Sequence, residues 1–394
     1  MRIVVYGGSF NPPHLGHIDA ANAACAQLKP DKFLLIPAAD PPHKELELGS
    51  PAPEMRLHLT RLAAREIPGA EVSGIELART GKSYSSDTVQ DLMRQYPGAE
   101  IVLVVGTDML LFFEEWHDFR WLLQHVTIAV FARDDGDEGK IAQHASYLNA
   151  AYGAHIVCLE KRPLPMSSTQ IRAQLRRRGG RTQLCDAVYR EVIQNRLYGA
   201  QPDFVWLREE AKKLLDPKRV PHVLGCEEEA ARLAWRWGAD PELAREAAIL
   251  HDITKKLTLD EQLPLCEKYG ILIDDMEKEN SQLLHAKTGA ALARALFGVS
   301  DAVYDAIFWH TTARAEMCLL EQVLYLADYI EPTRREFDGL EELRKEAYRD
   351  LDAAMILGLT MGIADIKRRG IQPHPRSADA LRWFRLQKTE KERC

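Results

Sequence analysis

The apolar pattern of this 394-residue chain changes close to residue 200. Before that point, helical segments, as at 15–28 and 168–178, separate short β-branched runs. The runs are 2–7, 32–39, 100–106, 126–133 and 155–160. Runs that are apolar on both faces are typical of parallel strands covered by helices on both sides.

Beyond residue 200 the sequence contains only amphipathic helical patterns, punctuated by glycine, proline and aspartate. We therefore predict a doubly wound, Rossmann-like α/β domain over residues 1–198 and an all-α domain over 205–385. The polar run 133–139 is interpreted as a solvated loop, and the tail after about residue 385 as disordered.

Composition limits the class of protein further. A net charge of −7 argues against a general nucleic-acid binder, whose domain is usually basic. Seven cysteines without a C-x-x-C pair indicate reduced thiols, and we expect neither a leader nor a membrane span. We predict a cytoplasmic protein that binds neither membrane nor nucleic acid. The pattern is compatible with a homo-oligomer.

The stretch "GGSFNPPHLGH" (7–17) occupies the turn between the first predicted strand and helix. Gly7 and Gly8 let backbone amides approach a ligand, and two prolines stiffen the turn. His14 and His17, three residues apart at a helix start, project from one face and form a compact, partly cationic cradle for phosphate. On spacing alone, a metal half-site or two surface histidines are alternative interpretations.

The full stretch resembles the H-x-G-H signature of the nucleotidylyltransferase superfamily. Other stretches narrow the resemblance to bacterial nicotinate-nucleotide adenylyltransferases over about residues 1–198. They are "PPHK" (41–44), "SYSSDT" (83–88), "GTD" (106–108) with Trp116 downstream, "FAR" (131–133) and "SSTQIR" (167–172). The chain departs from that family at Asn11, where an acidic residue is frequent, and after Arg133, where Pro-Gly is usual.

The resemblance implies that AMP passes from ATP, bound with Mg²⁺, to nicotinate mononucleotide, giving deamido-NAD and pyrophosphate. It implies that His14 and His17 stabilise the charge on the phosphates. It also implies that Arg172 faces the triphosphate and that Lys44 closes over it. The implied substrate contacts are Gly7, Gly8, Ser9, Phe10, Ser83, Tyr84, Gly106, Asp108, Trp116, Arg133, Ser168 and Thr169.

Two of these contacts have plainer alternatives. Asp108 would hold a ribose, although an aspartate after a strand is usually a cap. Trp116 would stack on the nicotinate ring, although a lone tryptophan is more often a core residue. The basic run "RRRGGR" (176–181) fits a solvated helix end better than a nucleic-acid contact.

The helical half places histidines and aspartates inside apolar segments. They are His222, His251, Asp252, His285, His310 and Asp328. A single buried histidine is usually a satisfied core residue. Burying several charges is costly unless they share a strong partner, and a divalent cation is the natural one.

The order H…HD…H…H…D resembles the HD phosphohydrolase superfamily. Neighbouring stretches such as "HVLGCEEEAARLA" and "AAILHDITKK" are similar to bacterial HD-type symmetrical bis(5'-nucleosyl)-tetraphosphatases, over about residues 205–365. Those enzymes split diadenosine tetraphosphate into two ADP. Family members often have glycine where Ala313 and Glu316 stand.

This second resemblance implies a dinuclear centre with Asp252 as the shared ligand. One metal would be held by His222, His251, Asp252 and Asp328, and the other by Asp252, His285 and His310. Lys255, Arg314 and Arg334 would neutralise phosphates, with surface charges as the alternative for each. The family points to iron, whereas the ligand types also admit manganese, cobalt or zinc.

The sequence thus predicts a bifunctional enzyme that acts on ATP, nicotinate mononucleotide and dinucleoside polyphosphates. One alternative keeps both folds and changes the substrates, for example to phosphopantetheine in the first half and another nucleotide in the second. A further alternative makes the second half a metal-dependent nucleotide sensor rather than a catalyst.

Overall fold

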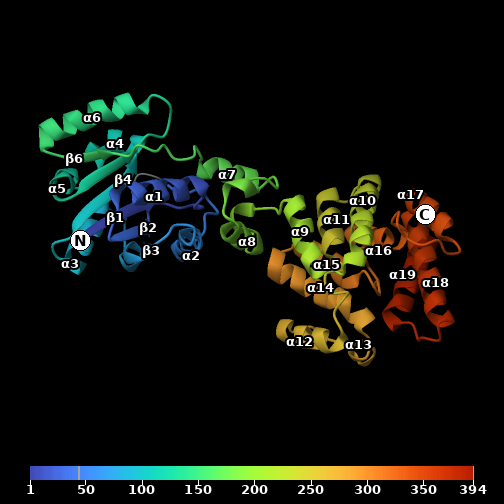
Figure 1. Ribbon diagram of the computed structural model, residues 1–394. Helices are drawn as coiled ribbons and strands as arrows, with labels where there is room; N and C mark the ends of the chain where they lie inside the picture. Colours follow the sequence, from blue (N-terminus) through green and yellow to red (C-terminus); the bar gives the residue numbers. More distant parts are fainter. Residues whose placement is uncertain (43–44, 394) are drawn as a thin grey trace. The chain divides into compact units, whose positions relative to one another are not determined.

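A computed structural model describes residues 1–42 and 45–393, so the prediction for Lys44 lies outside the described residues. The chain divides into two compact units, one spanning Met1–Pro202 and the other beginning at Asp203 (Figure 1). Across the described ranges, every helix is too short or too polar to span a bilayer.

Unit 1 is built on a parallel sheet with the order β3-β2-β1-β4-β5-β6. Its strands are β1 (Arg2–Gly8), β2 (Lys32–Pro37), β3 (Ala70–Val72), β4 (Glu100–Gly106), β5 (Thr127–Phe131) and β6 (His155–Cys158). This order reverses direction between β1 and β4, and ligands bind at such a switch point, beyond the carboxyl ends of the strands.

Helices cover both faces of this sheet (Figure 1). They are α1 (Leu15–Leu28), α2 (Pro53–Ala64), α3 (Ser85–Gln95), α4 (Thr107–Leu111), α5 (Phe119–His125), α6 (Asp137–Tyr152), α7 (Ser168–Leu175) and α8 (Asp186–Gln194). Alternate strand residues such as Ile3 and Val5 pack with α3, α5 and α6 in one core. Their neighbours Val4 and Phe33 are equally buried on the other face. The predicted doubly wound domain is confirmed.

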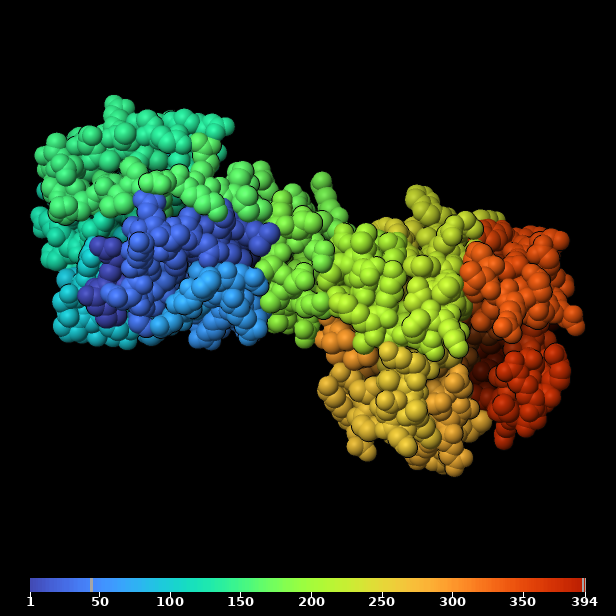
Figure 2. All heavy atoms as spheres, viewed as in Figure 1, coloured from blue at the N-terminus to red at the C-terminus, as the bar shows by residue number. Residues whose placement is uncertain are grey.

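Unit 2 is helical throughout its described residues, which confirms the second part of the fold prediction. Its helices are α9 (Phe204–Leu214), α10 (Val220–Trp237), α11 (Pro241–Leu250), α12 (Leu259–Tyr269), α13 (Asp275–Lys278), α14 (Ser281–Phe297), α15 (Asp301–Trp309), α16 (Leu319–Ile330), α17 (Leu340–Arg349), α18 (Leu351–Arg368) and α19 (Pro375–Arg393). Helices α10, α11, α14, α15 and α16 pack against one another, and α17–α19 lie together in orange and red in Figure 2.

Three local predictions differ from the structure. The supposed loop 133–139 includes the first turn of α6, where the Asp137 carboxylate accepts the backbone N–H groups of Arg133 and Asp134. The tail after residue 385 is helical through Arg393, as part of α19. Strand β6 is an edge strand, and three of its four residues are exposed, so it is not covered on both faces.

The loop between α15 and α16 holds Ala313 and Glu316 in left-handed backbone conformations, with φ of 57° and 58°. A side chain disfavours this region by about 1–2 kcal/mol, whereas glycine enters it freely. These are the two positions where the HD-type tetraphosphatases, which this half resembles, often have glycine. The loop geometry therefore explains that preference without any role in phosphate binding.

We expect Glu316→Gly to stabilise unit 2. Glu316 is exposed, so the substitution removes backbone strain without opening a cavity. The gain should be about 0.5–1 kcal/mol, or about 1–4 °C in calorimetry of the whole chain. Glu316→Ala keeps the Cβ atom and is the control. An equal rise for Glu316→Ala would assign the gain to lost charge rather than to the backbone.

Candidate functional sites

The turn after β1 ends in a capping arrangement made by two histidines. His14 is the extended N-cap of α1, and its Nδ1 accepts the backbone N–H of His17 at 3.3 Å. His17 Nδ1 in turn accepts the backbone N–H of His14 at 3.2 Å. The two rings stack with centroids 3.7 Å apart. Because both Nδ1 atoms are acceptors, the ring protons lie on the Nε2 atoms, which remain available as donors.

These histidines differ from the predicted partly cationic cradle. Burial, reinforced by the charge of Arg133, lowers the pKa of His14 to about 4. Burial and the neighbouring His14 hold the pKa of His17 well below its usual value. The pair is therefore neutral near pH 7, and it offers hydrogen bonds rather than charge.

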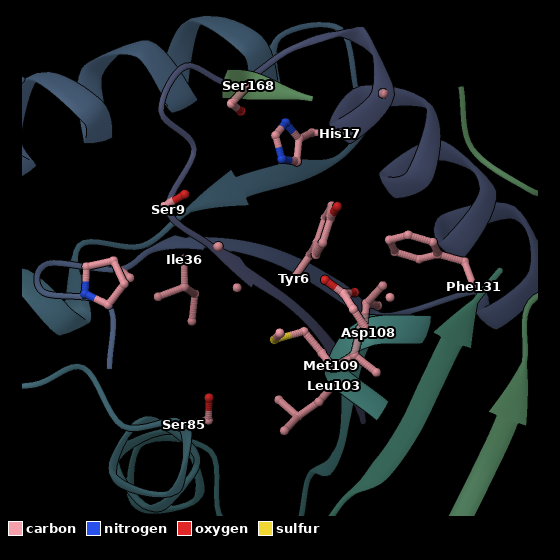
Figure 3. Close-up of a pocket in the computed structure, with 18 of the residues that line it drawn as sticks. Tyr6, Ser9, His17, Ile36, Ser85, Leu103, Asp108, Met109, Phe131 and Ser168 are labelled. Carbon is pink, nitrogen blue, oxygen red and sulfur yellow. The ribbon is translucent and has the colours of Figure 1, made fainter. Parts of the chain in front are cut away.

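A cavity of about 760 Å³ lies at the carboxyl ends of β1, β4 and β5. In Figure 3, Ser9 and His17 come from the β1–α1 segment, whereas Asp108 and Met109 come from α4. Twelve predicted site residues line it: Gly7, Gly8, Ser9, His14, His17, Ser83, Tyr84, Gly106, Asp108, Trp116, Arg133 and Ser168. Within the described chain, Phe10, Thr169 and Arg172 are not among the lining residues.

Arg133 supplies fixed positive charge at this cavity. Its guanidinium forms a 3.0 Å ion pair with the Asp108 carboxylate. A Cβ atom at Gly106 would lie only 2.6 Å from Arg133 Nε, so the side chain can cross here only over a glycine. Both partners of the ion pair are about half exposed, and either can turn toward a bound ligand.

Arg172 does not face the cavity as predicted. It is buried behind the β1–α1 turn, donates to the Asn11 carbonyl at 2.7 Å and pairs with the Glu47 carboxylate at 2.7 Å. Thr169 accepts from the same guanidinium. Ser168 Oγ donates to the carbonyl of Pro12 at 3.1 Å. Helix α7 thus fixes the histidine-bearing turn from behind, and Arg172 is neutralised there.

Several aromatic rings line the same cavity. Trp116 is half-buried and stacks on Phe113 with centroids 4.7 Å apart. Tyr84 stacks on His117 at 4.3 Å, and both line the cavity. Ser83 Oγ accepts the backbone N–H groups of the β2–α2 loop. His117 was missed from sequence, although it directly follows the tryptophan that was singled out.

In unit 2 the six predicted metal ligands converge from α10, α14, α16 and the turns that directly follow α11 and α15. His222 Nε2 lies 3.0 Å from Asp328 Oδ1, and His285 Nε2 lies 3.3 Å from Asp252 Oδ1. His251 Nε2 lies 3.4 Å from Asp252 Oδ2. The four imidazoles and Asp252 are buried, while the Asp328 side chain is about one-fifth exposed.

Each imidazole presents its Nε2 atom to the cluster because an oxygen acceptor holds its Nδ1 atom. The Nδ1 atoms of His251, His285 and His310 lie 2.6–2.7 Å from carbonyl oxygens three residues earlier. His222 Nδ1 lies 3.1 Å from the Glu331 carboxylate. Such partners place the proton on Nδ1 and leave an Nε2 lone pair, the arrangement found in histidine metal ligands.

The resulting electrostatics fit a shared cation. Burial lowers the pKa of His285, and it lowers that of His310 to about 3, so both rings are neutral. Their Nε2 atoms nevertheless lie only 3.1 Å apart. At His251, burial acts in the same direction, but the nearby Asp252 and Asp328 carboxylates favour the charged ring more strongly. The pKa of His251 is therefore raised above its usual value. Imidazole and carboxylate donors gathered in one buried place suit a divalent metal.

Arginine and lysine side chains lie around the cluster and differ in the groups that they contact. Arg219, which sequence reasoning missed, contacts the Asp252 carboxylate. Lys255 Nζ lies 3.1 Å from His285 Nε2, and burial lowers its pKa. Arg334 reaches Asp328 at 3.7 Å. Arg314 was predicted to neutralise a phosphate, but two hydrogen bonds pair it with the buried Glu321 carboxylate instead.

We expect Glu331→Gln to weaken metal binding by about 10–100-fold, because it removes the charge that orients His222. Gly225→Ala should act similarly, since its Cβ atom would meet Glu331 Oε2 at 2.5 Å. Calorimetric titration with Mn²⁺ measures both. The control is Glu229→Gln, a buried carboxylate on α10 that bonds Tyr348 instead. Unchanged affinity in both test variants would contradict the orienting role.

Comparison with known proteins matches each half separately. The cytidylyltransferase-like family matches residues 5–174, and the HD domain matches residues 219–333. A Carboxydothermus hydrogenoformans protein named "Probable nicotinate-nucleotide adenylyltransferase" is 34% identical over 198 residues, covering 50% of this chain and 98% of its own.

A Mycoplasma genitalium protein named "Probable nicotinate-nucleotide adenylyltransferase/Ap4A hydrolase" is 28% identical, covering 91% of this chain and 97% of its own. Among solved structures, a "predicted HD superfamily hydrolase involved in NAD metabolism" from Clostridium acetobutylicum is 36% identical. It covers 47% of this chain and 97% of its own, with a TM-score of 0.45.

These matches confirm the prediction of a nucleotidyltransferase joined to an HD hydrolase domain. The first half aligns with relatives above 30% identity over nearly their whole length. The second half carries the HD domain together with a His/Asp cluster suited to a divalent metal. The chain therefore belongs to the nicotinate-nucleotide adenylyltransferase family and continues into an HD domain.

Proposed function

We propose that unit 1 transfers AMP from ATP to nicotinate mononucleotide, giving deamido-NAD and pyrophosphate. The observation that carries this proposal is the stacked His14–His17 pair. Its two Nε2–H donors lie at the N-terminus of α1, in a cavity large enough for a dinucleotide. The names of the relatives of unit 1 support the choice of substrates.

In this reaction a phosphate oxygen of the mononucleotide attacks the α-phosphorus of ATP, and the bond to pyrophosphate breaks in line. No covalent intermediate with the protein is required. His14 and His17 would donate hydrogen bonds to the phosphate oxygens as charge builds on them, and Ser168 would do so only if its hydroxyl left the Pro12 carbonyl. Arg133 would neutralise the triphosphate once it leaves Asp108, with Mg²⁺ on the same phosphates.

The other ends of the substrates have matching partners. We assign the ribose to the freed Asp108 carboxylate. The nicotinate ring fits against Trp116, with its carboxylate near the backbone of Ser83 and Tyr84. Arg172 acts as a positioning residue for the His14 turn rather than as a phosphate ligand. A phosphate contact by Lys44 stays a prediction.

Assays of purified protein with ATP and one of three monoesters test this proposal. Nicotinate mononucleotide, nicotinamide mononucleotide and phosphopantetheine share the phosphate and differ in the remainder. We expect pyrophosphate release chiefly with the nicotinate compound. Preference for phosphopantetheine would support the alternative adenylyltransferase and would overturn the assignment of Trp116.

We further propose that unit 2 hydrolyses diadenosine tetraphosphate to two ADP at a dinuclear centre. The carrying observation is that four imidazoles, each held at Nδ1, direct Nε2 lone pairs at two carboxylates. His222, His251, Asp252 and Asp328 would hold one ion, and Asp252, His285 and His310 the second. Iron is the metal that the family resemblance favours.

The bound ions would supply Lewis acidity toward the phosphate and lower the pKa of a water molecule. The protein's own groups complete the site. Lys255 and Arg334 lie at the cluster and would neutralise phosphate oxygens. Arg314 would contribute only if it left Glu321, so we place it outside the immediate contacts.

Chromatography of products after incubation with diadenosine tetraphosphate tests this half. The full-length protein would be reconstituted separately with Fe²⁺, Mn²⁺ and Zn²⁺. We expect ADP as the single product. ATP with AMP would indicate asymmetric cleavage, and tight binding without any product would favour the nucleotide sensor.

A further inference from the structure

A cysteine thiol lies within the His/Asp cluster without having been predicted as part of it. Cys226 follows His222 by one turn of α10, so both side chains project from the same face. Its Sγ atom lies 3.5 Å from His222 Nε2 and is fully buried. The thiol therefore stands beside the nitrogen that the imidazole presents to the cluster.

A second observation points to a ligand at this position. His251 Nε2 is buried and makes no hydrogen bond within the described residues. One ligand atom each from His222, Cys226, His251 and Asp328 lie within 4.8 Å of one another. Buried polar atoms without partners are rare in folded proteins, so this nitrogen indicates a site for a bound cation.

We propose that Cys226 is a thiolate ligand of the cation held by His222, His251 and Asp328. The inference rests on the proposed metal centre and adds sulfur to its donors. On binding, the metal–sulfur bond forms and the thiol proton leaves to solvent. A centre with thiolate, imidazole and carboxylate donors favours Zn²⁺, Co²⁺ or Cd²⁺ over Mn²⁺, because thiolate is the softest of these ligands.

The alternative is that Cys226 only fills space beneath the His222 ring, as buried free cysteines commonly do. The two roles differ spectroscopically. A coordinated thiolate gives Co²⁺ a near-ultraviolet charge-transfer band, whereas nitrogen and oxygen ligands do not. The full-length apoprotein is therefore titrated with Co²⁺, and bound cobalt is counted by elemental analysis.

We expect the band in the wild type and its loss in Cys226→Ala and Cys226→Ser, with cobalt still bound through the remaining ligands. The control is Cys266→Ala, which removes a buried thiol on α12 outside the cluster and should leave the band intact. Thermal melting of each apoprotein checks that the variants fold. If Cys226→Ala fails to fold, Cys226→Ser, which nearly preserves the side-chain volume, decides.

Affinity gives an independent measurement. Cys226→Ala should weaken Cd²⁺ binding at least about tenfold and Mn²⁺ binding by less. Stoichiometric cobalt without the band in the wild type would overturn the role of Cys226 and leave the metal centre standing. No bound metal at all would overturn both. A band that persists in Cys226→Ala would also contradict the proposal.

Discussion

Replacing His17 with alanine should lower the rate of adenylylation by at least about 10²-fold, the usual cost of removing one preorganised donor to a developing charge. Hydrolysis by unit 2 should be unchanged. The expectation follows from the position of His17, which lines the unit 1 cavity with its Nε2–H donor free for a ligand. Measuring kcat for pyrophosphate release and for ADP formation on the same preparation tests both statements.

His17 also caps α1, so His17→Ala is expected to cost stability. His17→Gln separates the two effects, because a glutamine at this position can still accept the His14 backbone N–H. We expect near-native melting together with the same loss of rate. The control is His125→Ala, an exposed histidine on α5 away from the cavity. Loss of both activities in His17→Gln would contradict separate sites.

Replacing Asp252 should have the reverse effect. This carboxylate lies between the two ligand groups, 3.4 Å from His251 Nε2 and 3.3 Å from His285 Nε2. We expect Asp252→Ala and Asp252→Asn to lower hydrolysis on the order of 10³-fold, since several kcal/mol of transition-state stabilisation depend on the bound ions. The number of bound metal ions should fall as well, and adenylylation should stay at the wild-type rate.

Two controls sharpen this expectation. Asp252→Asn nearly preserves shape, so its melting curve separates loss of ligation from loss of packing. Asp275→Ala removes a carboxylate that is almost fully exposed on α13, outside the cluster. Full metal content with normal hydrolysis in Asp252→Asn would rule out the bridging assignment.

The fold could be predicted well where burial imposes a pattern. β1 and β4 carry uninterrupted apolar residues because both faces of the sheet are covered, and these strands were placed to within a residue. β3 was missed because a three-residue strand at the sheet edge is only half-buried and leaves no periodicity. The α6 start was missed because its first residues are charged.

The sites were predictable through their motifs but not through their pairings. His14, His17 and the six predicted metal ligands stand in recognisable local contexts. Arg172 and Arg314 were expected to meet phosphate, whereas the fold pairs them with Glu47 and Glu321. Position in the chain does not reveal which carboxylate a basic side chain will meet.

The contact between Arg219 and Asp252 has a consequence for metal binding. The Arg219 guanidinium is a counter-charge to the buried Asp252 carboxylate within the helical unit. A cation that binds Asp252 therefore has to displace a side chain that is already paired with this carboxylate.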